Sequence, residues 1–190
     1  NLCLKGAGDP AFVSEKMWFL VNELTRNEIN KIEGDLIVDA TKFDNELFDS
    51  GRDSVRVDRA FDAPISAMSF NWNSVNVFVR PAKKVGDNAL VYIDPINTYI
   101  ELENKVKTSK DKKAINVERV KVNDHDKIIV TGTIPVNSSE FVAYKSITNP
   151  NLWAGNHLIQ FLKQRNIELK GNIKMGKCEE NSIKLASVDS

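Results

Sequence analysis

The sequence predicts an α+β protein in which an α/β domain is interrupted by an inserted, short-stranded all-β domain. The first reason is composition: the 190 residues are 42% hydrophobic and 27% charged, with 9 Gly and 6 Pro. Such a chain folds as one large or two small globular domains. The second reason is that helical spacing of apolar residues occurs near the two ends of the chain. The third is that its middle holds only short strand patterns between polar turns.

The first forty residues predict a strand, a helix and a second strand. Residues 1–6 are typical of a strand. Ser14 is a candidate cap for a helix whose apolar residues follow the spacing i, i+3, i+4, i+7, namely Met17, Leu20, Val21 and Leu24. Residues 35–40 are a short apolar run between polar residues, as in a strand buried on both faces. This order favours an α/β domain.

A long loop and a further strand pattern follow. Residues 41–59 are polar and charged without a sustained period, which indicates a surface loop. Residues 63–80 have a β-like pattern in which Val75, Val77 and Val79 occupy alternate positions, and Pro81 ends it. We expect the sheet to continue through these residues.

The composition changes at residues 82–87, and we expect a small all-β domain over residues 82–142. Its strand patterns lie at residues 89–93, 99–102, 115–122 and 127–134. The lysine-rich residues 105–113 are expected to form a solvent-exposed hairpin tip, and phosphate or polymer binding is the alternative.

The last part of the chain returns to the α/β pattern. Residues 141–147 predict a strand, and Asn149-Pro150 is a helix start signal. The apolar stripe of that helix is Ala154, Leu158, Phe161 and Leu162. Asn166 suits a left-handed helix end, and residues 167–169 and 172–175 predict two short strands. Residues 1–81 and 143–190 are therefore expected to form one discontinuous domain.

Charge and hydropathy exclude several classes of partner. The chain carries 26 Lys and Arg against 26 Asp and Glu, so no net charge attracts it to nucleic acid or to an anionic lipid surface. Its longest apolar stretches are far shorter than the roughly 18 residues that a membrane span needs. We expect neither a nucleic-acid partner nor a membrane span.

The cysteines and histidines indicate no metal and no cofactor. Cys3 and Cys178 lie too far apart for a local metal-binding or redox motif. They are either two buried free thiols or a disulfide, and a disulfide would imply an oxidising compartment. His125 and His157 have no metal-binding or catalytic motif around them.

No catalytic set stands out from the composition. A serine nucleophile needs a base within reach, and Ser-x-x-Lys occurs once, at Ser109 to Lys112, about as often as chance predicts. That string is polar, whereas its lysine would have to be desolvated to act as a base. Ser-x-Asn occurs twice, at residues 69–71 and 74–76, again about as chance predicts, and Lys-Thr-Gly is absent. Whether the chain is itself an enzyme stays open.

Five strings, taken in order, resemble one family. They are residues 4–10 (LKGAGDP), 34–39 (GDLIVD) followed by Phe43-Asp44, 63–68 (APISAM), 130–135 (VTGTIP), and Ala154-Gly155 in the second helix. This order is similar to that of the class C low-molecular-mass penicillin-binding proteins, the DacB-type D-Ala-D-Ala carboxypeptidases and endopeptidases. The resemblance spans essentially the whole chain.

In that family, a serine domain carries Ser-x-x-Lys, is interrupted by a two-part insertion, and then supplies Ser-x-Asn and Lys-Thr-Gly. This chain resembles the insertion alone. The resemblance therefore implies a non-catalytic region of a periplasmic or exported serine-type carboxypeptidase, whose catalytic domain binds the peptidoglycan stem peptide. The alternative is a stand-alone binding module that holds cell-wall polymer or a protein partner through residues 105–113.

The resemblance also implies one contribution to the substrate pocket. In relatives, the loop before the Ala-Pro-Ile-Ser-Ala string lends an aromatic and an acidic residue to the pocket for the stem-peptide side chain. Phe61 stands at the aromatic position. A gapless alignment puts Arg56 where the acid is common, with Asp58 and Asp53 nearby. Phe61, Asp58 and Arg56 are thus the pocket candidates, and packing of the Phe61 ring against the sheet is the alternative.

Overall fold

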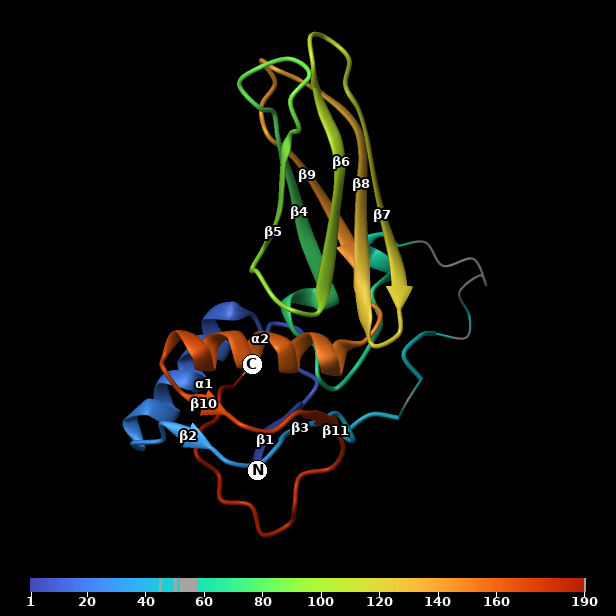
Figure 1. Ribbon diagram of the computed structural model, residues 1–190. Coiled ribbons are helices and arrows are strands. Elements are labelled where there is room, and N and C mark those ends of the chain that lie inside the picture. The colour runs from blue at the N-terminus through green and yellow to red at the C-terminus, as the bar shows by residue number, and fades with distance from the viewer. Residues whose placement is uncertain (45, 50, 52–57, 190) are drawn as a thin grey trace. The chain divides into compact units, whose positions relative to one another are not determined.

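The structure is a computed structural model that describes residues 1–44, 46–49, 51 and 58–189. It combines helices with four small sheets, which confirms the predicted mixed α and β class (Figure 1). The chain divides into two compact units. Unit 1 comprises the described residues within 1–55, 64–73 and 149–190, and unit 2 those within 56–63 and 74–148. No helix of the described residues has the length and hydropathy of a membrane span.

Unit 1 is built on short parallel strands. Strands β1 (Leu2–Lys5) and β11 (Ile173–Met175) pair with the two edges of β3 (Leu36–Asp39). Strands β2 (Lys31–Ile32) and β10 (Glu168–Leu169) form a second parallel pair. Because β3 is central, Leu36 and Val38 are fully buried, as its continuous apolar run predicted.

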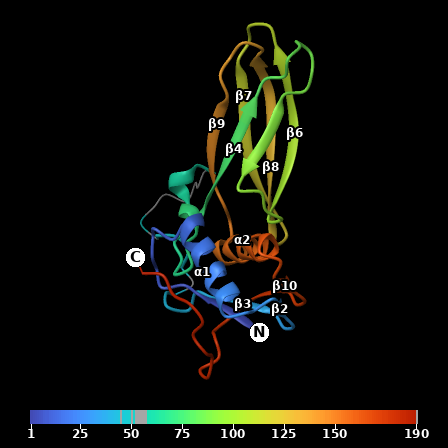
Figure 2. The same cartoon turned by 90° about the vertical axis from the view of Figure 1, so that its left-hand side faces the viewer.

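The helix α2 (Pro150–Gln164) begins and ends where the sequence predicted. The Asn149 side chain accepts hydrogen bonds from the backbone N–H groups of Asn151 and Leu152, at 3.1 Å each. Asn166 adopts φ 57° just beyond the end. Figure 2 shows α2 next to the strands of unit 1. Gly155 allows close packing there, since a Cβ would lie 3.1 Å from Val38 Cγ2 and 3.0 Å from Ile173 Cγ2.

The helix α1 (Ser14–Arg26) forms as predicted, with Met17, Val21 and Leu24 buried, but its start differs from the prediction. Val13 occupies the N-cap position, and Ser14 is the first helical residue. The Ser14 N–H donates to the Asn71 side chain at 3.1 Å, and the Asn71 amide donates back to the Ser14 hydroxyl at 3.0 Å. The capping oxygen therefore comes from a distant segment rather than from Ser14.

Residues 63–73 are not the strand that the β-like pattern predicted. They run irregularly to the 3₁₀ turn η2 (Asn71–Asn73), and all three residues of η2 have positive φ. The buried Asn73 side chain accepts from Phe70 N–H and donates to the Pro64 carbonyl. These side-chain hydrogen bonds satisfy backbone groups that a strand would pair with a neighbour, so the segment turns instead.

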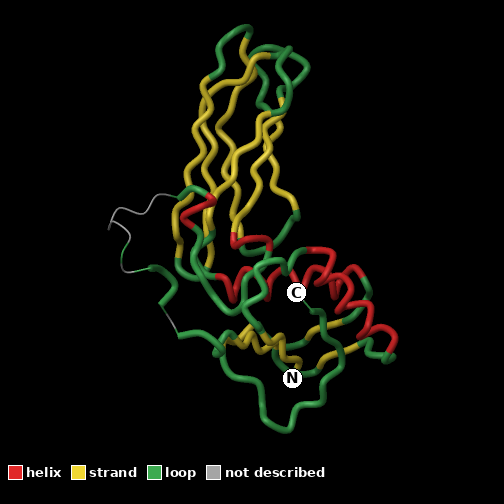
Figure 3. The backbone as a smooth tube through the Cα atoms, turned by 180° about the vertical axis from the view of Figure 1, so that it is seen from behind, coloured by secondary structure: helices red, strands yellow, loops and turns green. Residues whose placement is uncertain are grey.

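The strands of unit 2 form two three-stranded sheets, and Figure 3 shows them in yellow, side by side. The first sheet places β4 (Ser74–Arg80) between β5 (Leu90–Asp94) and β9 (Phe141–Ser146), all antiparallel. The sequence assigned β4 and most of β9 to the α/β domain and drew the boundaries at 81/82 and 142/143. The structure divides instead at 73/74 and 148/149, because the backbone hydrogen bonds of β4 join it to β5 and β9.

The second sheet of unit 2 contains β6 (Ile100–Ser109), β8 (His125–Pro135) and β7 (Ala114–Val122), in that order. The strand β8 pairs with β6 in parallel and with β7 antiparallel. The predicted hairpin pairing over residues 105–113 is therefore wrong, although residues 110–113 are solvent-exposed as predicted. Residues 105–109 belong to β6. The chain then connects to β7, which lies on the far side of β8. The side chains of β8 alternate, over most of its length, between buried and partly exposed.

Candidate pocket-forming turn

The first pocket candidate, Phe61, lies in the short 3₁₀ turn η1 (Ala60–Asp62) of unit 2. Backbone hydrogen bonds close the turn, from Asp62 N–H to the Arg59 carbonyl at 2.9 Å and from Ala63 N–H to the Ala60 carbonyl at 3.1 Å. The Phe61 ring is 66% exposed, and the Arg59 guanidinium lies 4.3 Å from its centroid.

The second candidate, Asp58, holds the turn against the sheets of unit 2. Its carboxylate oxygens accept from the Lys145 ammonium and from the Arg119 backbone N–H, each at 2.7 Å. Its own carbonyl accepts from Ser146 N–H at 3.0 Å. A β-bridge joins Arg59 to Lys145 next to it. Asp58 therefore links three separate segments, and both carboxylate oxygens are engaged within the fold.

The electrostatics of Asp58 favour its ionised form. Burial raises the pKa of this carboxyl, but hydrogen bonds from Lys145 and Arg119 and their positive charges outweigh burial. Its pKa consequently lies below the ordinary value of 3.8. Arg119 is positioned by the same cluster: its guanidinium donates to the buried Ser146 hydroxyl at 3.4 Å.

The third candidate, Arg56, lies outside the described residues, and so does Asp53. Sequence reasoning missed Arg119 and Lys145, the partners of Asp58. They are 61 and 87 positions away from it, and neither stands in a recognisable motif. Arg119 lies in β7 and Lys145 in β9, strands of two different sheets, so the sequence alone carries no signal for this cluster.

The serines of the Ser-x-x-Lys and Ser-x-Asn strings lie in strands or turns of the fold. The Ser109 hydroxyl, at the end of β6, donates to the Lys112 carbonyl at 2.5 Å, and the Lys112 side chain is exposed. The Ser69 hydroxyl donates to the Ser66 carbonyl at 3.0 Å. Ser74 begins β4. Ser109 therefore opens no buried helix, and the Lys112 side chain stays in solvent rather than in a desolvated site.

The two cysteines are joined, which decides between the two possibilities left open by the sequence. The Cys3 and Cys178 sulfur atoms are 2.02 Å apart, and the bond ties β1 to the segment after β11. The neighbouring Asp39 carboxylate is buried and accepts from the N–H groups of Cys178 and Thr41 and from the Thr41 hydroxyl. Cys3, Asp39 and Cys178 are the one cluster of three potential metal ligands within the described ranges, and its sulfurs are bonded to each other.

Both histidines have local partners. His157 is buried against the rings of Phe70 and Trp153, and its Nδ1 lies 2.8 Å from the Trp153 carbonyl. His125, the first residue of β8, lies with its Nε2 3.5 Å from a carboxylate oxygen of Glu101. His157 lies in unit 1 and His125 in unit 2.

A protein-family model and curated proteins of known activity match this chain. The family model described as D-Ala-D-Ala carboxypeptidase 3 (S13) matches residues 1–190. A D-alanyl-D-alanine carboxypeptidase of Actinomadura sp. (strain R39) is 26% identical over 182 residues, which cover 93% of this chain and 34% of that protein. The D-alanyl-D-alanine carboxypeptidase DacB of Haemophilus influenzae is 24% identical over 174 residues, which cover 91% and 36%.

Solved structures share the fold. The crystal structure of penicillin binding protein 4 (dacB) from Haemophilus influenzae superposes with a TM-score of 0.74 and 18% identity, covering 97% of this chain and 41% of that one. The same protein complexed with a β-lactam gives a TM-score of 0.67 and 19% identity, with 97% and 39% covered. The chain thus spans about a third of the length of the curated relatives it matches. Since the family model matches the whole chain, the protein belongs to the D-Ala-D-Ala carboxypeptidase 3 (S13) family.

Proposed function

We propose that this chain is the non-catalytic insertion region of a serine-type D-Ala-D-Ala carboxypeptidase or endopeptidase that acts on peptidoglycan stem peptides. One observation carries the proposal: the chain matches the family along all 190 residues, yet its Ser-x-x-Lys string lies at the end of a strand with an exposed lysine. Activation of a serine needs a base that is close and desolvated. Bond cleavage would then belong to a part of the protein outside this chain.

In this proposal, unit 2 is an all-β domain inserted into the α/β fold of unit 1. The chain leaves unit 1 before η1, returns to it for residues 64–73, and leaves again at β4. It enters unit 1 finally at α2. Two crossings in each direction give the insertion four connections, which would restrict its movement more than a single linker could.

We further propose that the η1 turn lends Phe61 to the stem-peptide pocket of the complete enzyme. The Phe61 ring is 66% exposed in this chain, so a substrate could contact it. Asp58 would then act as a positioning residue, because its carboxylate already binds Lys145 and Arg119. The proposed cellular location is the periplasm or outside the cell, where the Cys3–Cys178 disulfide would persist.

A fluorescent penicillin tests the absence of catalysis. The purified chain is incubated with the reagent beside penicillin binding protein 4 of Haemophilus influenzae and separated on a denaturing gel. We expect label on that protein and none on this chain, because no activated serine is available to form an acyl ester. Label on this chain that disappears in a Ser109→Ala variant would overturn the proposal.

The role of Phe61 is tested in the longer protein that the proposal requires. Phe61→Ala should lower kcat/KM for a stem-peptide substrate by about 10-fold, because a hydrophobic wall of the pocket is lost. Phe61→Tyr should retain most of the activity. Phe19→Ala removes a comparably exposed aromatic ring from unit 1 and is the matched control. Equal effects of Phe61→Ala and Phe19→Ala would contradict a pocket role.

A further inference from the structure

The η2 turn holds Trp72 in a backbone conformation that tryptophan rarely adopts. Three consecutive residues, Asn71, Trp72 and Asn73, have positive φ values of 47°, 54° and 50°. Left-handed backbone is costly for side chains other than glycine, although asparagine tolerates it better than most. Such strain persists only where the surrounding structure imposes it, and it is often linked to function. An asparagine or a glycine at position 72 would form this turn with less strain.

The fold accounts for both asparagines of η2. The Asn71 side chain accepts from Ser14 N–H at 3.1 Å and so caps α1. The buried Asn73 side chain accepts from Phe70 N–H at 3.1 Å. The residues on each side of Trp72 are therefore fixed by long-lived structural contacts, and the turn presents the tryptophan from a well-defined position.

The Trp72 ring projects from this turn into solvent. It is 67% exposed, whereas Trp153 is fully buried and donates its indole N–H to the Phe70 carbonyl at 2.9 Å. Trp18 packs against the Phe161 ring, with 5.9 Å between the ring centroids. Within the residues that the structure describes, the Trp72 side chain takes part in no hydrogen bond, ion pair or ring contact. Its ring and its N–H donor are thus available to a ligand.

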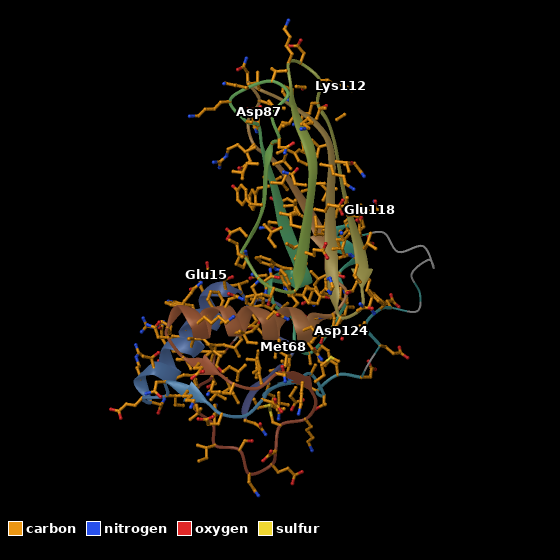
Figure 4. All side chains as sticks on the ribbon, in the orientation of Figure 1. Glu15, Met68, Asp87, Lys112, Glu118 and Asp124 are labelled. Atoms are coloured by element: carbon orange, nitrogen blue, oxygen red, sulfur yellow. A yellow bond between two sulfur atoms is a disulfide. The ribbon has the colours of Figure 1, made fainter. Side chains whose placement is uncertain are left out.

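The segment around Trp72 carries no charged side chain. None of the residues 64–79 is Asp, Glu, Lys or Arg, although 27% of the whole chain is charged and 27% of 16 residues is about four. Met68, labelled in Figure 4, is 1% exposed and anchors the same segment in the core of unit 1. An exposed aromatic ring in an uncharged segment suits a neutral ligand rather than a phosphate or a nucleic acid.

A sugar ring is a neutral ligand whose shape matches Trp72. One face of a pyranose consists of C–H groups that stack on an aromatic ring, and its hydroxyl groups accept from donors such as the indole N–H. A protein partner would instead need about 800 Å² on this side, with several anchoring residues. Ile65, at 59% exposure, is the other large apolar residue that residues 64–73 expose. Two side chains supply far less area than a stable protein interface requires.

We propose that Trp72 is a stacking site for the glycan strand of peptidoglycan, the polymer that carries the stem peptides. The identity of the polymer rests on the proposed function, and the proposal goes beyond that function by assigning a sugar site to unit 1. Stacking on Trp72 holds the glycan strand while the stem peptide reaches the catalytic part of the longer protein. It requires neither serine acylation nor the Phe61 pocket.

Oligosaccharides of N-acetylglucosamine, which carry no stem peptide, test the site in the 190-residue chain. Isothermal titration calorimetry measures binding, and acrylamide quenching of tryptophan fluorescence reports whether the saccharide covers the Trp72 ring. The unmodified chain should bind, and its quenching should decrease with the saccharide. Trp72→Asn should weaken binding at least about 10-fold, because the stacking ring is lost. Its denaturant midpoint should stay the same or rise, because asparagine tolerates positive φ.

The matched control is Tyr144→Asn, which removes a ring that is 58% exposed on β9 and should leave saccharide binding unchanged. Absence of saccharide binding by the unmodified chain, equal loss in both variants, or a lower denaturant midpoint for Trp72→Asn would each overturn the proposal. Self-association that depends on Trp72, seen by analytical ultracentrifugation without saccharide binding, would overturn it in favour of an interface between two copies. Penicillin labelling tests the proposed function separately. A chain that binds the saccharide and is also labelled keeps the sugar site and loses the non-catalytic role.

Discussion

Asp58 has two partners that reach it from distant strands, and this makes a single carboxylate responsible for the geometry of the η1 turn. Asp58→Asn retains the side-chain shape but removes the charge that Lys145 balances and weakens the acceptor for Arg119 N–H. We expect the free energy of unfolding to fall by about 1–3 kcal/mol, measured by denaturant titration. Asp62→Asn is the control. Among the described residues, its carboxylate pairs with the exposed Arg59 alone, at 3.4 Å, so its loss should cost under about 0.5 kcal/mol.

Asp58 should also affect how the free energy of unfolding changes as the pH falls. Because the pKa of Asp58 is lower in the folded protein than in the unfolded chain, its contribution to stability is present above pH 3.8 and is lost as the pH falls further. Asp39, buried yet held ionised by Cys178 N–H and Thr41, has a lowered pKa and acts in the same direction. Asp58→Asn should therefore lose less stability than the unmodified chain between about pH 7 and pH 3. Identical pH profiles would contradict this account of the cluster.

Single residues were predictable where their partners are near in sequence. Asn149 caps a helix two and three positions ahead, and Asn166 ends the same helix, so local rules were sufficient. Asn71 caps the start of α1 from 57 positions away, and no local rule could indicate it. The pairing of Cys3 with Cys178 stayed open for the same reason, because only β1, β3 and β11 in register bring the two sulfurs together.

At the scale of elements, Gly132 allows close pairing of β7 with β8, the middle strand of the second sheet of unit 2. It lies within β8 with φ 111°, and a Cβ there would stand 1.7 Å from the Ala114 carbonyl oxygen of β7. Gly132→Ala should therefore force β7 and β8 apart and lower the free energy of unfolding by about 3–5 kcal/mol. Gly86→Ala is the matched control: its φ is also positive, at 94°, but nothing lies near the added Cβ. That variant should cost only about 1 kcal/mol, and a similar cost for both would refute the steric explanation.

The helices and most strands were predictable, because apolar spacing reports which face is buried. The failures share a cause. Residues 63–73 were included in a β-like pattern whose alternating valines lie at 75, 77 and 79, but side-chain hydrogen bonds of Asn73 satisfy the backbone locally. Residues 105–113 looked like a hairpin tip because two strand patterns flank them. Sequence adjacency suggested that β6 and β7 pair, whereas β8 lies between them. Local pattern identifies strands but does not determine which strands pair.

At the scale of the whole molecule, the two units are nested within one another along the chain. Unit 1 is assembled from three segments, and the Cys3–Cys178 disulfide encloses the entire sequence of unit 2. A change of composition near residue 82 indicated a second domain, but it did not locate the crossings, since a strand pattern alone does not show which unit β4 and β9 join. The family resemblance indicated an insertion, and the exact division follows from strand pairing.

The division into two units predicts that tryptophan and tyrosine signals can follow the unfolding of each unit separately. Trp18, Trp72 and Trp153 all lie in unit 1, and Tyr92, Tyr99 and Tyr144 all lie in unit 2. Replacing Cys3 and Cys178 by Ser removes a cross-link that restricts the unfolded chain of unit 1, while unit 2 has no cysteine of its own. We expect a loss of about 3–5 kcal/mol from unit 1. The tryptophan fluorescence transition should move to lower denaturant concentration, while the tyrosine absorbance transition of unit 2 moves much less. If both transitions move together by the same amount, the units unfold as one, and the disulfide stabilises the whole molecule rather than unit 1.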